Sequence, residues 1–185
     1  MIKRGIIGAA FVWLWIAAAF AVVYNPTSTL TLTSATTQYS AGQLIANNAT
    51  AASVTVPSFN IPNTPSGAII PRVRLFSDDT LSTAWAGQTI QIDLWNAAPT
   101  FVNGDRGAWQ VATGSNGHLA TFTCIMSAIQ SDGSFASCSI GVGNFAAIIN
   151  AALATPVYWS AKAVTGTSGV TTASKHLTLT VEILN

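Results

Sequence analysis

The chain has 185 residues, enough for one domain or for one domain with an appendage. Charged residues make up only 7% of it, against about 25% in an ordinary globular protein, and the formal net charge at pH 7 is +1. This balance excludes a basic surface for nucleic acid, so we expect no direct nucleic-acid binding. Soluble proteins this poor in charge often sit in assemblies, where neighbouring subunits limit aggregation.

The chain begins with an uncharged apolar stretch, residues 5–24, behind the two cations Lys3 and Arg4. About 20 apolar residues can cross a bilayer core of about 30 Å as a helix. The preceding cations would hold that end in the cytoplasm. The stretch also has the features of a signal peptide, because Ala19 and Ala21 have the spacing of a cleavage site.

We therefore treat residues 1–24 as a separate hydrophobic helix that acts as an anchor, a signal or an interface. A buried core helix is less favoured, because the stretch has no polar face for water. Trp13 and Trp15 lie in its middle and are candidate interface residues. The sequence leaves open whether residues 1–21 are kept in the mature protein. Residues 25–185 form the second predicted unit.

Apolar and polar residues alternate from Ser28 onward, beginning with STLTLTS. Alternation of this kind is typical of half-buried strands. Further strand-like runs lie at residues 52–56, 72–76, 89–95, 120–126, 134–140, 157–163 and 177–184, separated by Gly, Pro and Asn. The pattern predicts an all-β fold, an antiparallel β-sandwich or jelly roll of about eight strands.

One proline and one segment depart from the alternating strand pattern. Pro71 precedes RVRLF, which predicts that this strand begins there or lies at a sheet edge. Residues 145–153, FAAIINAAL, show no alternation and contain helix formers, which predicts a short helical turn.

Cys124 and Cys138 are the two cysteines of the chain. Both lie on predicted strands, and with the turn sequence SDG between them these strands could be neighbours, with the two sulfur atoms facing each other. Either a disulfide or two buried free thiols fits. Neither a CxxC motif nor a Cys/His metal spacing occurs.

The search for catalytic or cofactor chemistry gives weak candidates. GVGNFA at Gly141 resembles a dinucleotide-binding fingerprint, but the required acidic residue and parallel βαβ setting are missing. His118 and His176 have no Asp or Cys at a spacing that suggests a proton relay, and Asp78–Asp79 suits a turn. We expect neither an enzyme nor a metal or other cofactor.

Two tryptophans and one arginine are candidates for an interface, since Trp and Arg are enriched at binding hot spots. Trp85 and Trp109 lie in predicted loops, whereas Trp95 belongs to a strand and is expected in the core. Arg106 lies in the turn NGDRG, where we expect it to be exposed.

Three segments resemble small proteins encoded by tailed bacteriophages. The shared features are a threonine-rich first strand, a Tyr-x-Ala-Gly turn, and a strand ending in a short AP(T)…NGD loop. The matching pieces here are Thr29–Ala46 with its turn Tyr39–Gly42, residues 68–79, and Ile90–Trp109 with Ala98–Thr100 and Asn103–Asp105. The likeness covers residues 27–165 approximately and contains no catalytic motif.

The resemblance implies a virion structural role, as a head decoration (cement) protein on the capsid surface. It further implies that the major capsid protein is the partner and that the chain forms a homotrimer. The apolar segment departs from this group, whose members begin close to the threonine-rich strand. A gene model extended upstream of a true start near Val22 or Val23 would explain the departure. A genuine membrane span through residues 5–24, in a minor capsid protein of a membrane-containing virion, would explain it as well. A competing class is a secreted or anchored β-sandwich that binds a glycan or a surface partner.

Overall fold

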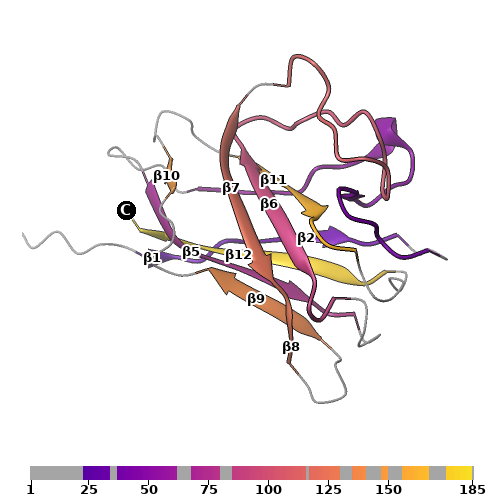
Figure 1. Ribbon diagram of the computed structural model, residues 1–185. Helices are drawn as coiled ribbons and strands as arrows, with labels where there is room; N and C mark the ends of the chain where they lie inside the picture. Colours follow the sequence, from indigo (N-terminus) through magenta and orange to yellow (C-terminus); the bar gives the residue numbers. More distant parts are fainter. Residues whose placement is uncertain are drawn as a thin grey trace, which may run out of the picture.

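The computed structural model describes residues 23–33, 37–61, 68–79, 85–115, 117–129, 135–140, 147–149, 156–166 and 174–184. These residues form two antiparallel sheets that pack face to face (Figure 1), so the predicted all-β sandwich is confirmed. The predicted N-terminal helix, with Trp13 and Trp15, lies outside the described residues. Within the described ranges, no helix is long and apolar enough to cross a membrane.

The larger sheet is built around two long central strands, β5 (Ala68–Ser77) and β12 (His176–Leu184). The outer edge of β12 is paired by two short strands, and the outer edge of β5 by two others. These edge strands are β1 (Val23–Tyr24) and β2 (Thr27–Thr31) on β12, β9 (Ala136–Ile140) and β10 (Ala147–Ile149) on β5, and β8 (Ser127–Ala128) on β9.

The smaller sheet has β11 (Val157–Ala163) and β6 (Thr89–Trp95) at its centre. Strand β7 (His118–Ile125) pairs with β6 and forms one edge. The other edge consists of β3 (Leu44–Ile45) and β4 (Ser58–Phe59), which pair with opposite ends of β11.

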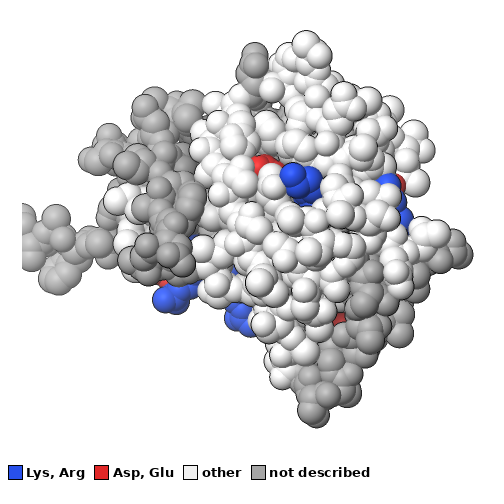
Figure 2. Space-filling view, viewed as in Figure 1, with Lys and Arg blue, Asp and Glu red and all other residues white. Residues whose placement is uncertain are grey.

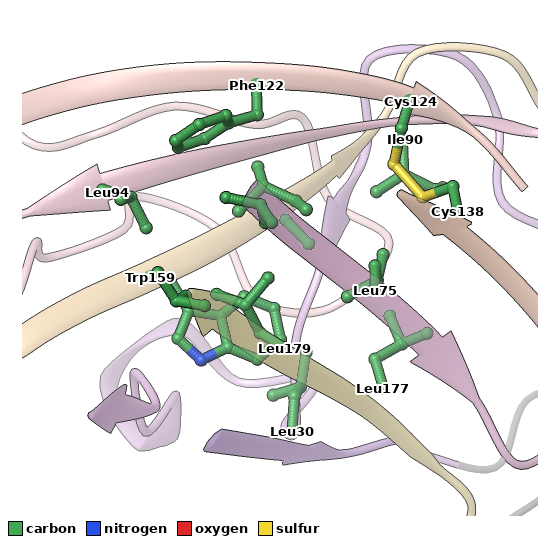
Figure 3. Close-up of a cluster of buried hydrophobic side chains, with 14 of the residues drawn as sticks. Leu30, Leu75, Ile90, Leu94, Phe122, Cys124, Cys138, Trp159, Leu177 and Leu179 are labelled. Carbon is green, nitrogen blue, oxygen red and sulfur yellow. A yellow bond between two sulfur atoms is a disulfide. The ribbon is translucent and has the colours of Figure 1, made fainter. Parts of the chain in front are cut away.

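The core lies between the sheets and is filled by the inward faces of the longer strands (Figure 3). Strand β12 shows the principle, because its residues alternate between fully buried and half-buried positions. Leu177 and Leu179 are completely buried, and each such side chain contributes about 1.5–3 kcal/mol relative to an exposed one. Trp159 is also fully buried, and its indole N–H donates to Ser28 Oγ at 2.9 Å.

Two local predictions are wrong. Residues 52–56 do not form a strand: a 3-10 turn, η1 (Ala51–Ser53), is followed by extended chain. Its alternation arises because Val54 and Val56 pack against a small satellite cluster of Leu44, Ala46 and Phe101. In the segment predicted as a helical turn, residues 147–149 are strand β10, which pairs with β5.

Pro71 lies inside a central strand and not at its start. The pairing of β5 with β12 shifts register between Glu182 and Leu184, so Pro71 lies at a β-bulge. On the other side of β5, the pairing passes from β10 at Ile70 to β9 at Val73. A bulge tolerates proline, because the missing N–H interrupts no regular ladder there.

Cys124 and Cys138 lie on β7 and β9, which belong to different sheets. The two strands are therefore not hydrogen-bonded to each other, and the short strand β8 pairs with β9 instead. Their sulfur atoms form a disulfide that joins the sheets across the core (Figure 3). The two Cα atoms are 5.9 Å apart.

Candidate functional site

The outer face of the smaller sheet carries the most chemically varied side chains of the described chain. On β6, Ile90, Ile92 and Leu94 point into the core, so Asp93 and Trp95 point outward. The segment that follows β6 returns over this face and brings Trp109 against Trp95, with ring centroids 6.4 Å apart. We call Trp95, Trp109, His118 and Lys162 the Trp109 surface.

Aromatic contacts hold the Trp109 surface together. Trp109 is half-buried between Trp95 and Phe101, and the Lys162 ammonium lies 5.1 Å from its ring centroid. His118 meets Trp95 edge to face at 4.9 Å, and the Trp95 indole donates to Ser160 Oγ at 3.1 Å. A cation over an indole face adds about 0.5–1 kcal/mol where the pair is exposed.

A buried carboxylate lies beneath this surface. The Asp93 side chain is only 2% exposed, although it is on the outer face of the sheet. It accepts hydrogen bonds from the Gln91 amide, at 2.9 Å to Oδ2, and from the Thr121 hydroxyl, at 2.5 Å to Oδ1. His118 Nε2 lies 3.2 Å from Oδ1. Strand register creates this group, because Asp93 pairs with Thr121, and His118 with Trp95.

The geometry of this group differs from a nucleophilic relay. His118 Nε2 faces both the Asp93 carboxylate and Thr121 Oγ1, the latter at 3.0 Å. A relay needs the acid and the nucleophile on different ring nitrogens, so that the imidazole can pass a proton between them. The arrangement instead fixes the orientation of the imidazole and presents its outer edge, since the His118 side chain is 46% exposed.

A shallow groove of about 420 Å³ lies next to the Trp109 surface. Phe101, which contacts Trp109, lines the groove, and so does Tyr158 near the start of β11. Its other walls come from the segment after η1 and from the Ala98–Thr100 loop. Its lining residues are uncharged.

Arg106 is not an exposed arginine as predicted, because its side chain is only 12% exposed. It forms an ion pair with Asp105, donates to Thr33 Oγ1 at 3.0 Å, and lies 4.2 Å above the Tyr39 ring. Its positive φ of 63° belongs to the tight turn that places both charges on the same side of the chain. Arg106 thus contacts residues within the domain.

Asp105 is the acceptor at the centre of this cluster. Its carboxylate accepts from the Tyr39 hydroxyl at 2.7 Å and the Ala46 N–H at 2.8 Å, and also from Thr33 and Arg106. Burial, then the negative charge of Asp105, raises the pKa of Tyr39 well above 10.0; the Arg106 charge lowers it in part. Gly104 packs so tightly against the preceding segment that a Cβ there would lie 2.0 Å from the Ala49 oxygen.

Trp85 is not exposed as predicted either. It is 1% exposed and belongs to the main core, where its ring centroid lies 5.8 Å from that of Tyr39. A predicted loop position therefore did not indicate a surface position. Of the three described residues predicted from sequence as interface candidates, Trp109 is the one that lies on the outer face of the smaller sheet. Sequence reasoning did not identify Asp93 as a partner of His118.

Both histidines have carboxylate partners that sequence spacing did not reveal. His118 meets Asp93, and His176 Nδ1 lies 2.7 Å from Asp78 Oδ2 across β12 and the end of β5. These pairs are 25 and 98 residues apart in the chain, so no local motif signals them.

Comparison with known proteins identifies no relative. No protein-family description, no curated protein and no solved structure matches this chain. Among the described residues, no group of three or more His, Cys, Asp or Glu side chains is placed to hold a metal ion.

Proposed function

We propose that this chain is a bacteriophage virion structural protein that binds the major capsid protein as a head decoration (cement) protein. The observation that supports it most strongly is the nested order of strand pairing. Counting the short neighbours together, the described strands occupy eight positions along the chain: β1/β2, β3/β4, β5, β6, β7, β8–β10, β11 and β12.

The first position pairs with the eighth, the second with the seventh, the third with the sixth and the fourth with the fifth. Position eight also pairs with position three, and position seven with position four. A single long hairpin rolled onto itself would give this nesting, which supports the jelly roll that the sequence predicts. Jelly rolls are typical of viral capsid domains and of lectins.

The surface also suits an assembly. Figure 2 shows few charged atoms on the visible face, and several large apolar side chains are exposed, including Ile125 and Ile129 at 63% and 50%. A decoration protein needs a rigid, charge-poor scaffold that contacts several capsid subunits at once, because avidity then supports the shell. A homotrimer at capsid-subunit junctions fits closed rotational symmetry.

The test is to purify particles from cells that express the chain and to measure its stoichiometry by imaging and mass spectrometry. We expect co-sedimentation with capsids and a copy number tied to capsid symmetry. Particles stripped of the protein should lose resistance to heat and chelators. Absence of the chain from particles, or unchanged resistance after stripping, would contradict the proposal.

The Trp109 surface supports a second candidate, a glycan-binding module, since lectins share the jelly-roll architecture. An exposed imidazole edge and a half-buried indole beside a lysine are groups that contact sugar rings. A glycan array probed with the wild type and with Trp109→Ala distinguishes the two. Binding that the substitution abolishes favours the module, whereas no binding by either protein favours the virion role.

A further inference from the structure

The outer face of the larger sheet ends in an apolar row that runs across its strands. Val23 on β1 is opposite Leu184 on β12, and Leu184 is opposite Ile69 on β5. Directly opposite residues in antiparallel strands share a face. Val23 and Ile69 are 51% and 44% exposed, and Leu184 is half-buried.

Charged residues lie immediately behind the apolar row on the same face. Arg72 is opposite Glu182 in the next pair along the sheet, and their side chains form an ion pair at 3.4 Å. Arg74 follows, opposite Thr180. From the end of the sheet inward, the outer face therefore carries first apolar side chains, then two arginines and one glutamate, and then threonines.

This row is also where the apolar N-terminal stretch joins the domain. Residues 5–22 are uncharged and run directly into Val23, with Lys3 and Arg4 at their far end. The stretch is long enough for a bilayer core. An apolar tip backed by arginines is the arrangement that places hydrocarbon in the interface and cations at the lipid phosphates.

We propose that this end of the sandwich docks on a lipid bilayer, with Val23, Leu184 and Ile69 in the interface and Arg72 and Arg74 toward anionic headgroups. The occupant is a lipid surface because the row continues a segment of membrane-spanning length, and because the flanking charge is mainly positive. This proposal does not depend on the decoration role.

The experiment uses the full chain reconstituted in vesicles of phosphatidylethanolamine and phosphatidylglycerol. One variant carries p-benzoyl-phenylalanine in place of Ile69, and the matched control carries it in place of Thr31. Thr31 is exposed on the same sheet, opposite His176 at the other end of β12, about 25 Å away at the rise of a strand. Irradiation followed by mass spectrometry identifies what each position contacts.

We expect a lipid adduct at position 69 and none at position 31. A crosslink to a second copy without a lipid adduct, equal adducts at both positions, or no adduct at position 69 would each overturn the proposal. Both sites are exposed, and thermal unfolding confirms that each variant folds. A label in place of Val23 gives an independent second reading.

The arginines are tested in the position-69 background. Arg72→Gln with Arg74→Gln should lower the equilibrium constant for docking about fivefold per arginine, and so reduce the lipid adduct, since each cation near an anionic surface is worth about 1 kcal/mol. The control Lys162→Gln removes a cation from the other sheet and should leave the adduct unchanged. An equal adduct in all three proteins would refute the role of the arginines in docking.

Discussion

Asp105 makes more contacts between distant parts of the chain than its place in a five-residue turn would suggest. It connects Thr33 after β2, Tyr39, the Ala46 backbone and the neighbouring Arg106. Its side chain is 1% exposed, so these partners replace water completely. A buried charge of this kind is tolerated only when it is fully paired.

Asp105→Ala should therefore destabilise the domain strongly. The substitution leaves the Arg106 charge in a largely buried position without its carboxylate, which costs about 3–5 kcal/mol. Urea unfolding followed by tryptophan fluorescence measures the change. The control is Glu182→Ala, which removes an exposed ion pair worth less than about 1 kcal/mol. Equal losses in both variants would contradict a special role for Asp105.

Tyr39 should make stability depend on alkaline pH. Its pKa is raised in the folded state, mainly by burial and then by the charge of Asp105, so the folded protein favours the neutral phenol. This contribution is complete below the unfolded pKa of about 10 and is lost as pH rises through the folded pKa. We expect unfolding free energy to fall above pH 10 in the wild type and much less in Tyr39→Phe. A pH titration of the urea midpoint in both proteins tests this, and parallel curves would contradict it.

At the scale of elements, the disulfide between β7 and β9 is the covalent link between the two sheets. It closes a segment with a sequence separation of 14, and a loop of about 15 residues gives about 3 kcal/mol in the chain-entropy account. Such a bond persists in an oxidising compartment or outside the cell.

Cys124→Ser combined with Cys138→Ser should lower the unfolding free energy by about 3 kcal/mol. A reducing agent should destabilise the wild type similarly and leave the double variant unchanged, which separates loss of the bond from loss of packing. Alkylation of the unreduced, unfolded wild type by iodoacetamide, read by mass, provides the control. Modification of both cysteines there would show that the thiols are free.

At the scale of the whole molecule, the nested pairing makes most contacts non-local. β1 and β2, at the beginning of the described chain, pair with β12 at its end. Both ends of the domain therefore meet on one sheet, where β1 lies beside β12 (Figure 1). Val23 pairs with Leu184 there.

The proposed function implies that the chain forms a homotrimer. We expect the purified protein in solution to have three times the 19.2 kDa mass of the chain, because its charge-poor surface gives little electrostatic repulsion between copies. Light scattering coupled to size-exclusion chromatography measures the mass over a range of concentrations. A monomer mass at every concentration would contradict the trimer but not the fold.

The amino-acid sequence by itself determined the all-β class and most strand positions. Alternation such as that from Ser28 onward is local information, since each inward residue is apolar whatever strand lies beside it. Where apolar spacing has another origin, as in residues 52–56 above the satellite cluster, the same reasoning failed.

Tertiary structure alone decided which distant residues meet. Asp93 reaches His118 through strand register, Asp105 reaches Tyr39 through the packing of two loops, and Cys124 reaches Cys138 across two sheets. Exposure was decided there too, since Trp85 and Arg106 are polar or loop residues by sequence yet are enclosed by the fold. The physical reason is that burial and pairing depend on which surfaces the folded chain brings together. The order in which the strands pair cannot be deduced from any local stretch of sequence.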